Sequence, residues 1–334
     1  MSSDDFAAKL KVAVVRHIGA PGTIHNFKQL TGGANKNTYE FEADVGAERL
    51  PLILQIPGKP KEDEPNPLEG VMPRVTAEQD ARLMIAARET GVPAPKVRAI
   101  LEPSDGFDPG YITEFVEGET LATKILREDK FARARTLMTK QCGEILAAIH
   151  SIDLKKVPFL GRQDAAEMVA GYYKVIDLSG FRLPALEFGM KWAAENAPKS
   201  ARHTVVHGDF RHGNFIVGEE GIRLMLDWEV GHSGDPMEDL AWVCVKTWRF
   251  GGRKPVGGFG TREELFAAYE KASGFTVDPK HVRWWEAWGG VKWAAGCLRL
   301  GTRGVEEVNV ERSAIGRRIE EPLWDYFSLI EGRD

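Results

Sequence analysis

The stretch from residue 203 to residue 242 constrains the fold of this chain most, because it places polar residues between short apolar runs. It has the sequence HTVVHGDFRHGNFIVGEEGIRLMLDWEVGHSGDPMEDLAW. The β-branched residues 204–206 predict a strand that enters a tight turn at Gly208, and Asp209 follows that turn. Two further apolar runs, 215–217 and 222–226, are separated by Gly-Glu-Glu-Gly, which predicts a β-hairpin.

This hairpin would bring Asp227 back beside Asn214, on the far side of a loop from Asp209. One carboxylate is then placed to accept a proton, while an amide and a second carboxylate offer hard oxygen ligands to a divalent cation. Phosphoryl transfer needs these groups. The simpler alternative is that each side chain only caps a turn. A rival interpretation takes His207, Asp209 and His212 as transition-metal ligands, but no further histidine motif completes such a site.

The N-terminal third of the chain alternates between strand and turn signals. Apolar periodicity predicts a helix over 4–18 and one main later helix over 76–90, which Gly-Val-Pro ends. The predicted strands are 23–30, 37–43, 50–56, 96–102 and 110–116. The proline-rich, acidic segment 57–75 predicts an exposed loop.

The remainder of the chain is mainly helical in pattern. The predicted helices are 120–128, 130–152, 165–176, 183–196, 236–248, 261–273, 279–300 and 313–330. We therefore expect an α+β protein with a smaller β-rich lobe over residues 1–116 and a larger helical lobe over 117–334, which begins with a connector at 117–119.

Charge and cysteine usage narrow the class of protein. A net charge of −5 over 334 residues gives no basic excess for nucleic acid or a membrane surface. No apolar run reaches a membrane-spanning length, and the acidic N-terminus does not have the pattern of a signal peptide. Cys142, Cys244 and Cys297 are widely spaced, which favours buried free thiols. We expect a cytoplasmic protein with no nucleic-acid or membrane partner; its oligomeric state stays unknown.

Three motifs in order make the polar stretch recognisable: HGD at 207–209 followed by Asn214, LDWE at 226–229, and GDPMEDLA at 234–241. Their spacing and the two-lobe layout resemble the aminoglycoside phosphotransferase and choline kinase superfamily, which has a protein-kinase-like fold, over nearly the whole chain. The segment 269–294 is most similar to one branch of it. That branch contains bacterial small-molecule phosphotransferases and the kinase domain fused to some acyl-CoA dehydrogenases.

The resemblance implies a bilobal kinase that uses ATP and Mg²⁺ to phosphorylate the hydroxyl of a small molecule. Asp209 would be the catalytic base, and Asn214 and Asp227 would hold the metal. The lobe over 1–116 would bind the nucleotide, the glycine loop covering its phosphates and residues 113–116 receiving adenine through the Glu114 carbonyl and the Val116 amide. The implied nucleotide-binding residues are Gly32, Gly33, Asn35, Gln55, Glu114 and Val116.

One residue departs from the family pattern. The family places a lysine or arginine on the third strand to hold the α- and β-phosphates, paired with an acidic residue on the next helix. This chain has Gln55 at that position, and the acidic partner is Asp80 or Glu78. Either the site is weakened, as in a nucleotide-binding pseudokinase or scaffold, or another cation serves.

Three cations are candidates for that service: Lys36 in the glycine loop, Lys59 after the third strand and Arg211 in the catalytic loop. We predict an active kinase, because Asp209 and both predicted metal ligands are retained. Arg211 is the foremost residue to test, since it lies two positions after Asp209 and can offset charge on the transferring phosphoryl group.

Aromatic and basic residues near the C-terminus suggest the class of acceptor. Most tryptophans there are expected to pack in the core, but Trp285, Trp288 and Lys292 share one helical face and are candidate acceptor contacts. An aminoglycoside needs acidic groups around it. We therefore expect an apolar or anionic alcohol, such as a hydroxy acid or its CoA ester. Adenylyl transfer is a further alternative reaction.

Overall fold

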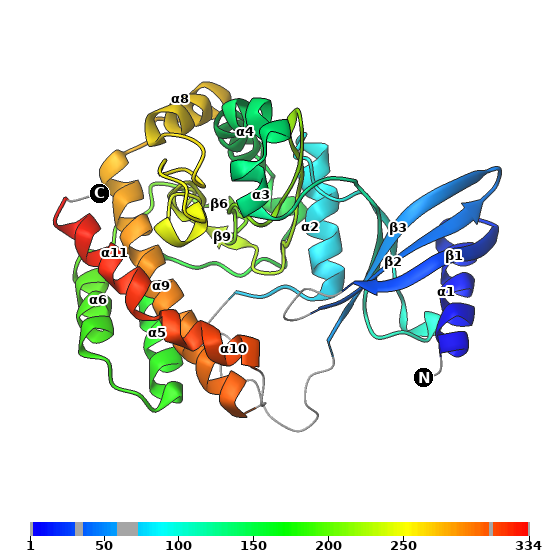
Figure 1. Ribbon diagram of the computed structural model, residues 1–334, viewed down its shortest axis with the longest axis horizontal. Helices are drawn as coiled ribbons and strands as arrows, with labels where there is room; N and C mark the ends of the chain where they lie inside the picture. The colour runs from blue at the N-terminus through cyan, green and yellow to red at the C-terminus, as the bar shows by residue number, and fades with distance from the viewer. Residues whose placement is uncertain (1–2, 31–35, 59–72, 307–309, 333–334) are drawn as a thin grey trace.

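The computed structural model describes residues 3–30, 36–58, 73–306 and 310–332 (Figure 1). A β-sheet forms one end of the molecule and helices the other, with the N-terminus beside the sheet and the C-terminus at the opposite end. The predicted α+β, two-part architecture is confirmed. Gly32, Gly33, Asn35 and Lys59 lie outside the described residues, and their roles stay predictions.

The N-terminal sheet is antiparallel throughout, in the order β1-β2-β3-β5-β4. Its strands are β1 (Pro21–Leu30), β2 (Lys36–Val45), β3 (Glu48–Pro57), β4 (Val97–Ile100) and β5 (Tyr111–Glu114). Alternate residues of β3, Leu52, Leu54 and Ile56, are buried, as the two-residue period of a strand requires. They form a core with Leu10 and Val14 of helix α1 (Ser3–His17), so α1 covers one face of the sheet.

Helix α2 (Ala77–Glu89) lies between the sheet and the helical part (Figure 1). A capping box begins it: Gln79 N donates to Thr76 Oγ1 at 3.2 Å, and Thr76 N donates to Gln79 Oε1 at 2.9 Å. Such a cap contributes about 1 kcal/mol. The buried side chains of α2, including Leu83 and Met84, belong to the large core of the helical part and not to the core of the sheet. The division at residue 116 therefore stays a prediction.

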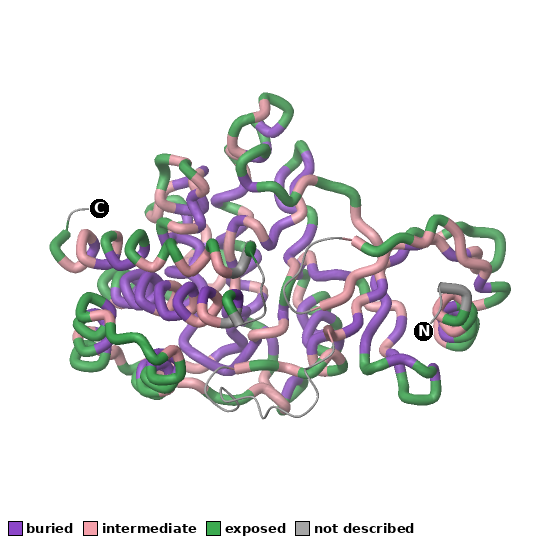
Figure 2. The backbone as a smooth tube through the Cα atoms, turned by 60° about the horizontal axis from the view of Figure 1, so that its bottom comes forward, coloured by how far each residue is buried: buried purple, intermediate pink, exposed green. Residues whose placement is uncertain are grey.

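Helices build the C-terminal part around α9. They are α3 (Ala122–Arg127), α4 (Ala132–His150), α5 (Ala165–Ser179), α6 (Pro184–Glu195), α7 (Met237–Trp242), α8 (Arg262–Ser273), α9 (Pro279–Glu306), α10 (Val310–Ile315) and α11 (Glu320–Ile330). Much of α9 is buried along its length (Figure 2). Helix α4 crosses α8 closely at Gly143, where an added Cβ would lie 2.7 Å from both Ala268 Cβ and Tyr269 N.

Two small antiparallel sheets interrupt the helices and hold the polar stretch. Strand β6 (Thr204–Val206) pairs with β9 (His232–Gly234), and β7 (Phe215–Gly218) pairs with β8 (Gly221–Met225). The predicted strand and hairpin are therefore confirmed. The sequence did not predict β9, because its His-Ser-Gly sequence contains no β-branched or aromatic apolar residue.

Two predicted helices differ from the structure. The segment 236–248 is not one helix: α7 ends at Trp242 and a 3-10 helix (Lys246–Arg249) follows, because Val245 adopts ψ 130° and breaks the helical path. The segment 313–330 is divided by a 3-10 helix (Gly316–Arg318), where Gly316 packs against Gly301 of α9 so closely that an added Cβ would meet backbone at 2.7 Å.

Candidate active site

Asp239 of α7 holds the turn that carries Asp209 through hydrogen bonds to its backbone. Gly208 adopts φ 78°, a conformation that glycine tolerates, and the amides on this turn point inward. The fully buried Asp239 carboxylate accepts hydrogen bonds from His207 N at 2.7 Å and Gly208 N at 2.9 Å. Burial alone would raise the pKa of Asp239, but the hydrogen bond to His150 and the His207 amide hold it below its ordinary value. Asp239 therefore ties α7 to this loop.

His207 is a positioning residue, because both of its ring nitrogens are in use. Nε2 donates to Leu226 O at 3.1 Å, and Nδ1 accepts the Asp209 amide at 3.2 Å. Burial lowers the pKa of His207, which agrees with a neutral ring that donates at one nitrogen and accepts at the other. The ring therefore links the Asp209 turn to the end of β8.

Three donors surround the Asp209 carboxylate. Trp242 Nε1 donates to Oδ1 at 2.8 Å, Arg211 Nε to Oδ1 at 2.9 Å, and Asn214 Nδ2 to Oδ2 at 2.6 Å. The side chain of Asp209 stays 20% exposed, so an acceptor hydroxyl can reach it. An arrangement with donors alone suits an ionised carboxylate, the form that can take up a proton.

The β7–β8 hairpin brings Asn214 and Asp227 together, as predicted. Leu226 N donates to Asn214 O at 2.8 Å, which closes the base of the hairpin. The side-chain nitrogen of Asn214 donates hydrogen bonds to Asp209, so the side-chain oxygen of Asn214 is the atom that can bind a cation. Asp227 has φ 66° and a 40% exposed side chain. This left-handed conformation costs a non-glycine residue roughly 1–3 kcal/mol, which fits a residue held for a function.

These two side chains offer the amide and carboxylate oxygens that Mg²⁺ takes, with positions left for phosphates and water. The transition-metal alternative has no support in the described residues, where no group of three or more His, Cys, Asp or Glu side chains could hold a metal ion. His212 is instead buried, with Nδ1 2.7 Å from Gly257 O, and burial lowers its pKa to about 4.

Lys36 forms ion pairs with three carboxylates, including that of Asp227. Its Nζ is 2.9 Å from Asp80 Oδ2, 3.5 Å from Asp227 Oδ1 and 3.4 Å from Glu229 Oε2. Asp80 is buried, whereas Glu78 is exposed and pairs with Arg82. Of the two acidic candidates on α2, Asp80 is therefore the one that faces the site.

Gln55 is held by its own neighbours. Its Oε1 accepts from the Tyr111 hydroxyl at 2.6 Å, and its Nε2 lies 3.4 Å from Thr38 Oγ1. The same Tyr111 hydroxyl is 2.8 Å from Asp80 Oδ2, so a single hydroxyl hydrogen is shared between the two acceptors. Gln55 thus lies beside the Lys36–Asp80 pair without supplying charge.

An aromatic wall made of Trp242, Trp248 and Trp293 lies beside Asp209. The ring centres of Trp242 and Trp248 are 5.4 Å apart, and those of Trp248 and Trp293 are 4.9 Å apart. Arg211 lies over the Trp248 ring at 4.4 Å, and Lys292 Nζ lies over the Trp242 ring at 4.8 Å. The wall thus carries two cations on its rings.

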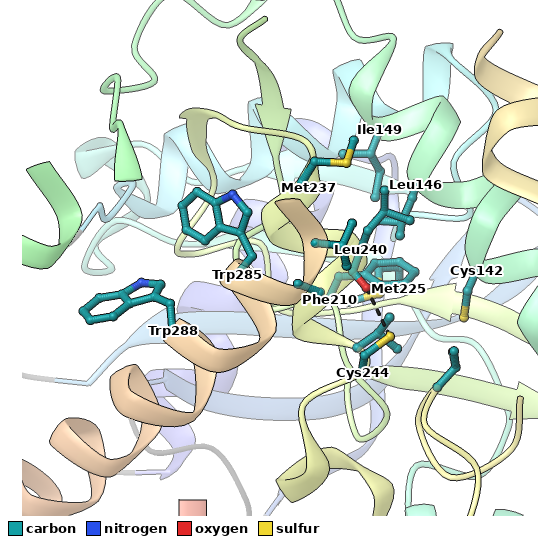
Figure 3. Close-up of a cluster of buried hydrophobic side chains, with 14 of the residues drawn as sticks. Cys142, Leu146, Ile149, Phe210, Met225, Met237, Leu240, Cys244, Trp285 and Trp288 are labelled. Atoms are coloured by element: carbon teal, nitrogen blue, oxygen red, sulfur yellow. Dashed lines mark hydrogen bonds between the residues drawn. The ribbon is translucent and has the colours of Figure 1, made fainter. Parts of the chain in front are cut away.

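Of the three predicted acceptor residues, only Lys292 lies at this wall. Trp285 and Trp288 also project from α9 (Figure 3) but are 2% and 0% exposed. Trp288 packs edge-on against Tyr172 at 5.3 Å and directs Nε1 to Met168 Sδ at 3.2 Å. Their placement favours core packing for both tryptophans, and a role in acceptor binding stays a prediction.

The predicted adenine segment leaves the sheet at the end of β5. Glu114 N donates to Lys96 O and Phe115 N to Pro51 O, each at 3.0 Å. Beyond Val116, Glu119 forms backbone hydrogen bonds with Val217 on β7, so the connector joins the sheet to the hairpin. The roles of the Glu114 carbonyl and the Val116 amide stay predictions.

Sequence reasoning missed Trp242, Tyr111 and Glu229 as members of the site. Trp242 and Tyr111 sit in apolar patterns that predict core packing, and nothing in the sequence indicates that their polar atoms reach Asp209 and Asp80. Glu229 carried a usable signal, since it lies two positions after Asp227 in the LDWE motif.

Comparison with known proteins places this geometry in a family. Residues 26–285 match the phosphotransferase enzyme family. Acyl-CoA dehydrogenase family member 10 of Mus musculus is 31% identical over 180 residues, which cover 50% of this chain and 16% of that protein. The chain spans between 16% and 30% of the length of the curated relatives it matches.

Solved structures share the fold at low sequence identity. The apoenzyme of macrolide 2'-phosphotransferase MphH from Brachybacterium faecium has a TM-score of 0.62 and 18% identity, and the match covers 93% of this chain and 97% of that one. A spectinomycin phosphotransferase in complex with ADP and spectinomycin has a TM-score of 0.63 and 14% identity, over 98% of each chain.

Two further properties bear on the setting of the site. Within the described residues, every helix is too short or too polar to cross a lipid bilayer. The three cysteines, Cys142, Cys244 and Cys297, are buried free thiols, as predicted.

Proposed function

We propose that this chain, which belongs to the phosphotransferase enzyme family, transfers a phosphoryl group from ATP, with Mg²⁺, to the hydroxyl of a small molecule. The observation that carries the proposal is the convergence of Asp209, Asn214 and Asp227. Asn214 Nδ2 lies 2.6 Å from Asp209 Oδ2, and the hairpin places Asp227 directly after the residue that bonds the Asn214 carbonyl. A base and two oxygen ligands thus share one edge of the β7–β8 hairpin.

Each of these side chains has a distinct task in this proposal. Asp209 accepts the proton of the acceptor hydroxyl, and its hydrogen bonds to Trp242 and Asn214 hold the carboxylate in place. Asn214 Oδ1 and the Asp227 carboxylate would hold Mg²⁺. When bound, the metal–nucleotide complex supplies the phosphoryl group and neutralises part of its charge. Residues 1–116 serve as the nucleotide-binding lobe, and residues 117–334 provide the catalytic loop and the acceptor site.

Arg211 acts on the acceptor side of Asp209 in this scheme. Its Nε is bonded to Asp209, and its guanidinium is stacked on Trp248, so the planar cation is held at the base. From that position it can offset negative charge on the transferring group or on an anionic acceptor.

The aromatic wall favours an apolar or anionic alcohol, such as a hydroxy acid or its CoA ester. The cations that stack on its rings are Arg211 and Lys292. Both cations are paired with a carboxylate, but the partner of Lys292 is the buried Glu238, whereas the partner of Arg211 is the proposed base Asp209 itself, so Arg211 is the cation that faces the acceptor. A polycationic aminoglycoside would meet this guanidinium beside Asp209 and be repelled by it.

The test is to incubate the protein with ATP and Mg²⁺ together with hydroxy acids, their CoA esters, amino alcohols, sugars and kanamycin, and to weigh the products. A gain of one phosphate that disappears in Asp209→Asn supports the proposal. Turnover of kanamycin would overturn the acceptor class.

Two other outcomes would replace the proposed reaction. A gain of AMP identifies an adenylyl transferase. Binding of Mg·ADP with no product from any acceptor, and no slow ATP hydrolysis, identifies a nucleotide-binding pseudokinase.

A further inference from the structure

Lys36 and Gln55 emerge on the same face of the sheet from neighbouring strands. The β2–β3 register pairs Thr38 with Gln55 and Lys36 with Pro57. Side chains two residues apart on a strand share a face, and paired residues on neighbouring strands do as well. Lys36 therefore projects from β2 on the face that Gln55 occupies on β3. The lysine's four-carbon stem can cover the offset of two residues.

The ammonium of Lys36 is placed between α2 and the predicted metal ligand. It lies 2.9 Å from Asp80 on α2 and 3.5 Å from Asp227, and its side chain is 16% exposed. Glu229 completes the cluster at 3.4 Å, with Arg74 on its other side at 3.9 Å.

Asp227 stays open to a further cation, because its Oδ1 is 3.5 Å from Lys36 Nζ while its side chain is 40% exposed. If Asp227 holds the divalent cation of a bound nucleotide, the phosphates of that nucleotide would lie beside Asp227. The Lys36 ammonium is then already adjacent to them.

We propose that Lys36 is the phosphate-anchoring lysine of this protein, moved from the third strand to the start of the second, with Asp80 as its helix partner. The inference rests on the proposed function, because it needs a nucleotide bound at Asp227. Gln55 then serves as a neutral neighbour that orders Tyr111 against Asp80 and leaves room for the lysine from β2.

The assignment separates the tasks of two cations. Arg211 is bonded to Asp209 and stacked on Trp248, so it belongs to the acceptor side. Lys36 is bonded to the acid on α2, as the phosphate-binding lysine of protein kinases is. The absence of a third-strand lysine therefore does not mark this chain as inactive.

The experiment measures binding of Mg·ADP and of adenosine by calorimetry, because only Mg·ADP has phosphates for Lys36 to contact. Lys36→Met should weaken Mg·ADP binding at least tenfold and leave adenosine binding within twofold of wild type. Adding Gln55→Lys to Lys36→Met should restore most of the lost Mg·ADP affinity, because it returns the charge to the third strand. Lys28→Met, on exposed β1 and paired only with Glu40 among the ion pairs of the described residues, is the matched control and should change neither affinity.

A second variant guards against loss of folding. Lys36→Met leaves the buried Asp80 carboxylate without its ammonium, so Lys36→Met/Asp80→Asn removes both charges together. It should unfold at a temperature close to wild type and still bind Mg·ADP weakly.

The failures of the two proposals are distinguishable. Equal Mg·ADP affinity in wild type, Lys36→Met and Lys36→Met/Asp80→Asn would overturn the assignment of Lys36 while the proposed function stands. An equal loss of adenosine affinity would overturn it too, because the lysine would then act only on the fold. Wild-type protein that binds no Mg·ADP would instead remove the proposed function itself.

Discussion

Replacing Asp239 with asparagine tests whether this buried carboxylate holds the catalytic turn. Its two oxygens accept the amides of His207 and Gly208 at 2.7 and 2.9 Å, with His150 Nε2 3.3 Å away. Asparagine keeps the shape and one acceptor oxygen, but its NH₂ group must face an N–H donor. The hydrogen bond to a charged group that is lost is worth about 1.5–3 kcal/mol, and because the amide it leaves unpaired is buried, the cost lies toward the upper end of that range.

We therefore expect Asp239→Asn to lose about 3 kcal/mol in unfolding free energy. That is a large share of the roughly 5–15 kcal/mol that stabilises a typical protein. Urea denaturation gives the global value. Hydrogen exchange at the His207 and Gly208 amides measures the free energy of local opening of the turn, and both amides should lose protection.

The control is Asp177→Asn, which removes the same charge from an exposed pair with Arg182 and should cost less than about 1 kcal/mol. Phosphoryl transfer should fall in Asp239→Asn as the turn loosens and stay unchanged in the control. A loss of stability below about 1 kcal/mol in Asp239→Asn, with amide protection intact, would refute the claim that Asp239 holds the turn.

Three further predictions follow from the packing and charge of the helical part. Gly143→Ala should cost about 1–3 kcal/mol of unfolding free energy, because its Cβ would meet α8 at 2.7 Å, whereas Gly161→Ala, with open space around it, should cost little in the same urea titration. Both ring nitrogens of His232 face acceptors, Val230 O and Glu238 Oε2. Burial alone would lower the pKa of His232, but Glu238 outweighs it and raises that pKa, so stability should be full below about pH 6.5 and fall as the pH rises through the raised value. Urea midpoints between pH 6 and pH 9 should drop more in wild type than in His232→Gln, and equal drops would contradict this. Burial raises the pKa of the Cys142 thiol, so dithiobis-nitrobenzoate should label this residue only after unfolding, and rapid labelling of the native protein would count against the core described above.

The sequence predicted the Asp209, Asn214 and Asp227 cluster because it is local. These residues lie within 19 positions of one another, and a single hairpin joins them, so the strand and turn signals determine their arrangement. The strands of the N-terminal sheet were predicted for the same reason, because the alternation of apolar and polar residues and the turn residues between strands are local features of the sequence.

The contacts that the sequence could not predict join distant segments. Lys36 meets Asp80 across 44 positions and Asp227 across 191, and both contacts depend on how the sheet packs on the helical part. The tryptophans show the same limit. Helical periodicity groups Trp285 with Trp288 correctly, but whether their face meets the acceptor or the core is decided by α5, which packs against it.

Helix α2 is rooted in the core of the helical part, although the strands on either side of it in sequence belong to the sheet. Asp80 therefore lies on a helix that shares its core with the stretch around Asp209, whereas Lys36 lies on a strand of the sheet. The ion pair between Lys36 and Asp80 joins the sheet to the helical part. Moving the sheet away from the helices would separate the buried Asp80 carboxylate from the Lys36 ammonium. If Lys36 binds the nucleotide phosphates as proposed, the same ammonium joins phosphate binding to the contact between the sheet and the helical part.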